Sequence, residues 1–160
     1  KLGYQVAAIT GKESEITFLR SLGATEIIQR SEFQQLDKRP MSKSRFAGAI
    51  DTVGGPILEN LIKSVDHMGV ITICGNVASA EFQTSVYPFI LRGLSLIGIE
   101  SQNYPMQDRL TIWGKLVHEW RPDHLMDLYS QIGLNELENK ITAILKGSLK
   151  GRTLIDLEAL

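Results

Sequence analysis

The 160-residue sequence predicts an α/β protein built on a doubly wound parallel sheet. Short apolar segments alternate with helix-like segments along most of the chain, and uniformly apolar strands are typical of parallel sheets covered on both faces. Several apolar segments also end in a glycine, as Gly48–Gly54 does. Ligands of such sheets bind beyond the carboxyl ends of the strands, so we expect functional residues in the loops that follow them.

The first part of the chain predicts two strands and the helix between them. Val6–Ile9 is a short apolar run, and Glu13–Leu22 has apolar residues at helical spacing. Gly23 is placed to close this helix with a left-handed backbone. Glu26–Ile28 is the second expected strand, and a short helix is expected at 32–36.

The middle of the chain predicts three further strands. Gly48–Gly54 is followed by Pro56, which fits the first position of a helix. We expect that helix to end at His67–Gly69, where a histidine is favourable. Val70–Cys74 and Leu94–Ile99 are the next two expected strands.

The last third predicts two helices and one strand. Gln107–Arg121 has an amphipathic pattern. Asn135 and Glu138 have the spacing of a capping box for a helix through Lys146. Thr153–Leu157 is the final expected strand.

Composition excludes several classes of function. A formal net charge of -1 provides no bulk attraction to nucleic acid or to an acidic membrane, so we expect neither as a partner. No apolar run is long enough to span a bilayer, and the first residues lack the apolar segment of a secretory signal. The single cysteine, Cys74, excludes an internal disulfide and suits a reducing compartment. We therefore expect a cytoplasmic protein.

Metal and covalent catalysis have little support in the sequence. The histidines form no close ligand pair with Cys74: His67, His118 and His124. Cys74 ends an expected buried strand, so it is interpreted as a small core residue rather than a reactive thiol. Tyr87 and Tyr104 could donate protons near the expected cleft, but packing is the preferred interpretation of Tyr87, which precedes Pro88. We assign no metal site and no catalytic residue.

The loop after the first expected strand indicates an anion site. In dinucleotide-binding sheets a carboxylate near the adenosine ribose favours NAD, whereas a cation accommodates the 2′-phosphate of NADP. Here Lys12 provides charge, Thr10 provides a hydroxyl, and Gly11 allows the backbone to approach. Arg30, after the next strand, would lie beside them and can bind a phosphate with its forked donors. The alternative is a solvated loop, because such residues are common at strand ends.

Several segments, in this order, resemble the medium-chain dehydrogenase/reductase superfamily: TGKES, FLRSLGATEII, AGAIDTVGG, PFILRG and GRTLIDL. The similarity is to its zinc-free quinone oxidoreductase branch, and within that branch to the acrylyl-CoA reductase group. The resemblance implies a Rossmann-like fold with NADP as cofactor. It assigns residues 1–150 to a partial NADP-binding domain and residues 151–160 to a strand that returns toward a catalytic domain.

The resemblance also carries cofactor contacts onto residues of this sequence. It implies a 2′-phosphate grip at Thr10, Gly11, Lys12 and Arg30, a nicotinamide wall at Asn76, Ile90 and Ser101, and a further contact at Gly147. The group more often has arginine where Lys12 stands, and lysine keeps the charge but loses the fork. It also commonly has aspartate where Glu100 stands.

The family's first strand and glycine-rich turn have no counterpart here. Asp51–Pro56 is the only comparable turn, and Pro56 removes a donor. We therefore expect a fragment whose inner strand edges pair with a second copy as a homodimer, aggregate, or belong to a longer parent.

Two functions from different classes follow. The first is part of an NADPH-dependent reductase that transfers hydride to an activated alkene, either acrylyl-CoA-like or a quinone-like enone, and that is inactive as an isolated fragment. The second is a non-catalytic nucleotide-binding or interaction module with a vestigial pocket. A methyltransferase on the same fold is a weaker third, against which Lys12 and the PFILRG segment count.

Overall fold

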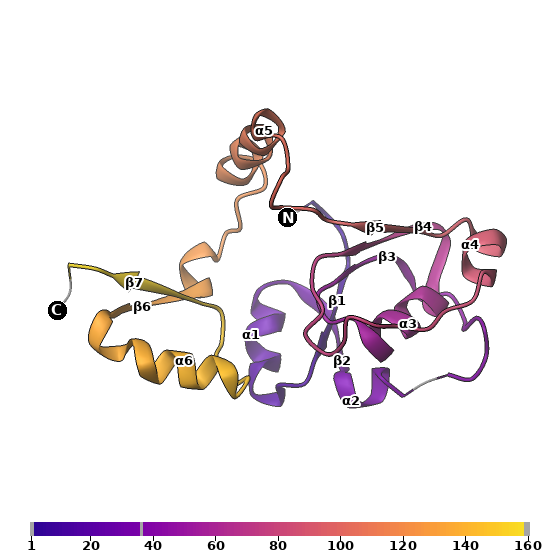
Figure 1. Ribbon diagram of the computed structural model, residues 1–160, viewed down its shortest axis with the longest axis horizontal. Helices are drawn as coiled ribbons and strands as arrows, with labels where there is room; N and C mark the ends of the chain where they lie inside the picture. Colours follow the sequence, from indigo (N-terminus) through magenta and orange to yellow (C-terminus); the bar gives the residue numbers. More distant parts are fainter. Residues whose placement is uncertain (1, 36, 159–160) are drawn as a thin grey trace. The chain divides into compact units, whose positions relative to one another are not determined.

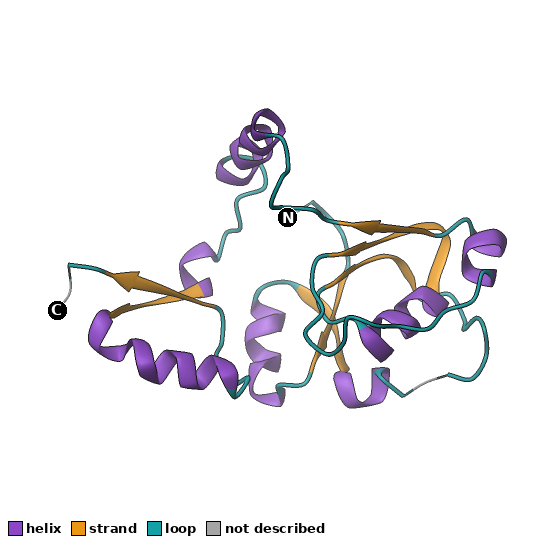
Figure 2. Cartoon of the chain, viewed as in Figure 1, coloured by secondary structure: helices purple, strands orange, loops and turns teal. Residues whose placement is uncertain are grey.

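The structure is a computed structural model that describes residues 2–35 and 37–158. The chain divides into two compact units. The large unit is Gln5–Met106, and the small unit is Lys1–Tyr4 with Gln107–Leu160. Figure 1 labels their elements and Figure 2 separates helices from strands. The domain boundary expected after residue 150 stays a prediction.

The large unit alternates strands and helices, as the sequence predicts. Its elements are β1 (Val6–Thr10), η1 (Glu13–Glu15), α1 (Ile16–Ser21), β2 (Ala24–Gln29), α2 (Arg30–Phe33), β3 (Phe46–Asp51), α3 (Gly55–Ser64), β4 (Val65–Ile73), α4 (Tyr87–Arg92) and β5 (Ser95–Gly98).

All strand pairs of the large unit are parallel, which confirms the predicted fold class. β1 pairs with β2, and β3, β4 and β5 form a three-stranded sheet in that order. Among the described residues no ladder joins β1–β2 to β3–β4–β5. The expected parallel arrangement is therefore present as two strand groups, each with a free edge.

The core lies where α3 covers β3–β4–β5. Ile62 of α3 and Val65 and Ile71 of β4 are fully buried, and Ile9 of β1 packs against this cluster at its margin. Pro56 takes an early position in α3, as predicted. The opposite side of β3 is open, since Ile50 is 79% exposed.

The helix expected to continue to His67–Gly69 ends earlier, at Ser64. The Ser64 hydroxyl donates to the carbonyl of Asn60 at 2.6 Å, a back-bond that competes with helix continuation. Val65 then adopts an extended backbone and starts β4. His67 consequently lies in a strand, so its expected place at a helix C-terminus is wrong.

The helix expected at Glu13–Leu22 is split between η1 and α1. Gly23 has a positive φ of +101°, which confirms the predicted left-handed backbone after the helix. The short helix expected at 32–36 is α2, four residues at Arg30–Phe33, and Leu36 lies outside the described residues.

The small unit contains α5 (Met106–Val117), η2 (Leu125–Leu128), β6 (Tyr129–Gly133), η3 (Leu134–Glu136), α6 (Leu137–Leu145) and β7 (Arg152–Asp156). β7 is the predicted last strand, and it pairs in parallel with β6, which the sequence analysis missed. The expected capping box at Asn135 is wrong, because η3 spans that residue and no side chain caps α6. No helix among the described residues has the length and apolar character needed to cross a membrane.

Candidate functional site

The carboxyl ends of β1 and β2 bring together the residues expected to bind a 2′-phosphate. Thr10 is the last residue of β1, and its Oγ1 accepts a hydrogen bond from the backbone N–H of Lys12 at 3.0 Å. Arg30 starts α2 directly after β2, and Thr10 and Gln29 are register partners. The parallel pairing therefore places Arg30 next to the loop that follows β1.

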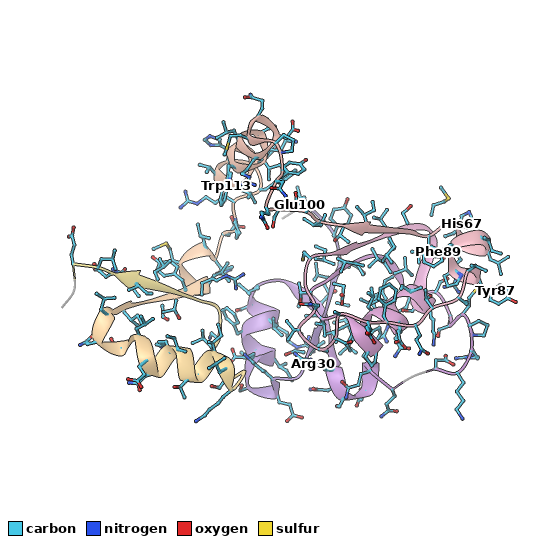
Figure 3. All side chains as sticks on the ribbon, viewed as in Figure 1. Arg30, His67, Tyr87, Phe89, Glu100 and Trp113 are labelled. Atoms are coloured by element: carbon cyan, nitrogen blue, oxygen red, sulfur yellow. The ribbon has the colours of Figure 1, made fainter. Side chains whose placement is uncertain are left out.

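Gly11 leaves room for the Arg30 guanidinium. A Cβ added at Gly11 would lie 3.4 Å from Cζ and 3.5 Å from Nε of Arg30. The guanidinium thus lies against the backbone of the loop that carries Lys12. Figure 3 labels Arg30 on the ribbon. Among the described residues, no carboxylate forms an ion pair with Arg30. Its donors remain available to an anion, which a forked guanidinium binds with high geometric specificity.

The carboxyl ends of β3, β4 and β5 form a second edge. Asp51, Ile73 and Gly98 are successive register partners. The N–H of Ile99 extends the ladder by donating to the carbonyl of Ile73 at 2.8 Å. The residues that follow these three strands therefore emerge side by side, which is where an open parallel sheet binds its ligands.

Two of these loops are interlocked through their backbones. The N–H of Ala78 donates to the carbonyl of Val53 at 2.8 Å. Gly54 has a φ of +72°, and a Cβ on it would lie 2.1 Å from the carbonyl oxygen of Ser79. Only glycine fits this close approach. The loops after β3 and β4 therefore form one fixed surface.

Two of the three expected nicotinamide-wall residues follow strands at this edge, whereas Ile90 lies on α4, which leads into the amino end of β5. Asn76 is in the loop after β4, Ile90 is in α4, and Ser101 follows β5. Ile90 is 68% exposed, so its side chain is open to a ligand. Gly147 follows α6 in the small unit with a φ of +66°. The first three residues therefore belong to the large unit and the fourth does not.

The sequence analysis missed the role of Asp51. Asp51 is buried, and its Oδ2 accepts the N–H of Gly54 at 2.9 Å. Its Oδ1 is buried with no hydrogen-bond partner in the described part of the chain. An Asp three residues before a glycine was a usable signal, because short acidic side chains commonly bind backbone N–H groups in turns. The carboxylate also makes this turn unsuited to a pyrophosphate.

The buried position expected for Cys74 is wrong. Cys74 follows the end of β4 and is exposed, and its Sγ lies 3.6 Å from the carbonyl oxygen of Asp51. The strand ends one residue earlier than expected, so the thiol emerges from the sheet rather than entering the core. Within residues 2–35 and 37–158, no group of three or more His, Cys, Asp or Glu side chains could hold a metal ion.

Comparisons with known proteins agree with this architecture. The sequence pattern of the zinc-binding dehydrogenase family matches residues 1–112. The acrylyl-CoA reductase AcuI of Ruegeria pomeroyi is 35% identical over 158 residues, which are 99% of this chain and 48% of that protein. The chain therefore spans about half the length of the curated relatives it matches.

Solved structures extend the likeness to three dimensions. The yhdH oxidoreductase from Salmonella enterica in complex with NADP matches with a TM-score of 0.92 and 36% identity, over 98% of this chain and 48% of that one. The Bacillus subtilis protein yhfP with NAD bound matches with a TM-score of 0.91 and 34% identity, over 97% of this chain and 47% of that one. These matches confirm the Rossmann-like fold class and the resemblance to the acrylyl-CoA reductase and quinone oxidoreductase group. The chain belongs to the zinc-binding dehydrogenase family.

Proposed function

We propose that this chain forms the NADP(H)-binding part of an NADPH-dependent reductase that acts on an activated alkene. The observation that carries the proposal is the Arg30 guanidinium lying against Gly11, between Thr10 at the end of β1 and Lys12 in the loop. Two cations at this point suit a dianionic 2′-phosphate. The likeness to the acrylyl-CoA reductase AcuI supports an acrylyl thioester as acceptor, and a quinone-like enone has the same conjugated chemistry.

The residues fit NADP better than NAD. β1 ends at Thr10, and the loop that follows begins with Gly11 and has no carboxylate before Glu13. An acidic side chain that would accept the ribose 2′-hydroxyl of NAD is therefore missing from the end of β1. One similar structure holds NADP and another holds NAD, and we propose that Lys12 and Arg30 give this chain its preference for NADP.

The remaining proposed contacts serve to orient the nicotinamide. A bound nicotinamide cofactor supplies the hydride, and the protein supplies position and electrostatics. We propose that Asn76 and Ser101, which follow strands at the carboxyl edge, bind this half of the cofactor. Ile90 lies on α4 beside the amino end of β5, and it is proposed only as an outlying contact. Gly147 is proposed as a further contact. No acid or base among these residues is assigned to proton transfer, and a cytoplasmic homodimer is proposed for the protein.

A turnover experiment separates the reductase from a non-catalytic nucleotide module. The longest natural form of the protein is mixed with NADPH and an acrylyl thioester, and NADPH absorbance is followed. The reductase predicts turnover on the order of 1 per second or more, and weaker or no turnover by the 160-residue chain alone. NADPH binding without turnover of any conjugated alkene would instead support the module, and absence of NADPH binding would contradict both.

A further inference from the structure

Glu100 is a charged side chain held in place at the carboxyl edge of β3–β4–β5. Its Oε1 accepts the backbone N–H groups of Gln102 at 2.7 Å and Asn103 at 2.9 Å, and its Oε2 also accepts that of Asn103 at 2.9 Å. Glu100 comes two residues after Gly98, the last residue of β5. These bonds fix both the carboxylate and the turn that contains Ser101.

The charge of Glu100 is not neutralised by a cation. No ion pair in the described part of the chain includes it. The first residues after β3 and β4 are uncharged: Thr52, Val53, Cys74, Gly75 and Asn76. The edge at β1–β2 is the opposite, with Lys12 and Arg30, and Figure 3 shows Arg30 well apart from Glu100 within the large unit. The candidate site is therefore positive at one end and negative at the other.

We propose that the Glu100 carboxylate selectively strengthens the binding of NADP⁺ over that of NADPH. This inference rests on the proposed function, since it requires the nicotinamide to lie beside the Ser101 turn. The nicotinamide ring carries a positive charge only in the oxidised cofactor, whereas the 2′-phosphate is the same in both. A fixed carboxylate near the ring stabilises the oxidised form selectively. Bound NADPH then becomes a stronger hydride donor.

A charge effect and a positioning effect of Glu100 would change the dissociation constants of NADP⁺ and NADPH in different ways. If Glu100 only holds the Ser101 turn, its loss weakens the binding of NADP⁺ and of NADPH by the same factor. If its charge acts on the ring, the loss changes the ratio of the two dissociation constants. Glu100→Gln removes the charge and keeps one acceptor oxygen, whereas Glu100→Asp keeps the charge on a shorter side chain.

The experiment measures dissociation constants for NADP⁺ and NADPH on the longest natural form of the protein, by calorimetry and NADPH fluorescence. Glu59→Gln is the matched control, because the Glu59 carboxylate also accepts a backbone N–H, that of Gln83 at 2.9 Å, but lies on α3. We expect Glu100→Gln to weaken NADP⁺ relative to NADPH by about threefold to tenfold at low salt. Glu100→Asp and Glu59→Gln should leave the ratio within about twofold, and 1 M salt should shrink the effect of Glu100→Gln.

The outcomes are separable from those of the proposed function. A wild-type protein that binds neither nucleotide contradicts the proposed function and this inference together. A wild-type protein that binds both, with a ratio unchanged in Glu100→Gln, overturns the inference alone. Equal weakening of both nucleotides in Glu100→Gln also overturns it, since that result assigns Glu100 a positioning role only.

Discussion

The two strand groups of the large unit differ in how they are covered. β3–β4–β5 share with α3 a core that includes three fully buried side chains, Ile62, Val65 and Ile71. β1–β2 contribute one buried apolar residue, Ile28. The candidate phosphate grip lies on the thinly covered group, and the interlocked backbone surface lies on the well-packed one. The loops after β3 and β4 therefore extend from a packed core, whereas the proposed phosphate grip lies on strands with little buried apolar surface.

Removing core volume should have the largest effect, and it should destabilise the two strand groups to different extents. Ile62→Ala should lower the free energy of unfolding by about 2 to 5 kcal/mol, because it leaves a cavity under β3–β4–β5. The same substitution at half-buried Ile27 of β2 should cost about 1 to 2 kcal/mol. Urea denaturation followed by circular dichroism measures both variants. Equal losses would show that the two groups are packed alike.

The interlocked loops provide the next largest effect. Gly54→Ala should cost about 2 to 4 kcal/mol of unfolding free energy, because its φ is +72° and the new Cβ would meet the Ser79 carbonyl. Gly98→Ala is the matched control at the end of β5, where no atom lies within 4 Å of an added Cβ. We expect that variant to stay within about 0.5 kcal/mol of the wild type. Thermal unfolding of a Gly54→Ala protein at the wild-type temperature would refute a fixed surface here.

The two edge strands of the well-packed group, β3 and β5, can be compared by self-association. Ile50→Lys places a charge on the open side of β3, where the isoleucine is 79% exposed, and should weaken association of the 160-residue chain about tenfold. Ile97→Lys does the same on β5, where the side chain is 46% exposed. Sedimentation velocity reports which substitution acts. A compact wild-type monomer at all concentrations would contradict the expectation that these edges pair with a second copy.

The segment that connects the two strand groups, residues 34–45, should show the smallest effect on the free energy of unfolding. That effect should depend on pH. Asp37 accepts hydrogen bonds from Arg39 and Ser42, and these bonds hold the pKa of its carboxyl well below its usual range. A lowered folded-state pKa contributes stability above the unfolded value of about 4, and that stability is lost as the pH falls further.

The measurement is the difference in unfolding free energy between wild type and Asp37→Asn. It should be constant from pH 7 to about 5 and shrink below about pH 4. The loop is also tied to the well-packed group, because Ser42 donates its N–H to the carbonyl of Lys63 at 3.0 Å. A difference that grows on acidification would have the wrong sign for this account.

Sequence reasoning recovered the strands except β6, because short apolar runs that end in glycine have few other interpretations. It placed Arg30 beside Gly11 by the rule that parallel strands end together. It failed where hydrogen bonds from side chains to the nearby backbone, or the exact length of a strand, decide the structure. The Ser64 hydroxyl ends α3 early and turns His67 into a strand residue, and a strand that stops at Ile73 leaves Cys74 exposed. Glu100 binding the N–H groups of its own turn also has no periodic signature.

The proposed 2′-phosphate grip at the end of β1 is tested most directly by the ratio of NADPH to NADH affinity. Both nucleotides are titrated against the longest natural form of the protein and against Lys12→Ala/Arg30→Ala, with Arg20→Ala of α1 as a matched loss of surface charge. The account predicts that the wild type and Arg20→Ala prefer NADPH by at least about tenfold and that the double variant loses this preference. Equal affinities in the wild type, or a preference that survives the double substitution, would contradict a 2′-phosphate site at Thr10, Gly11, Lys12 and Arg30.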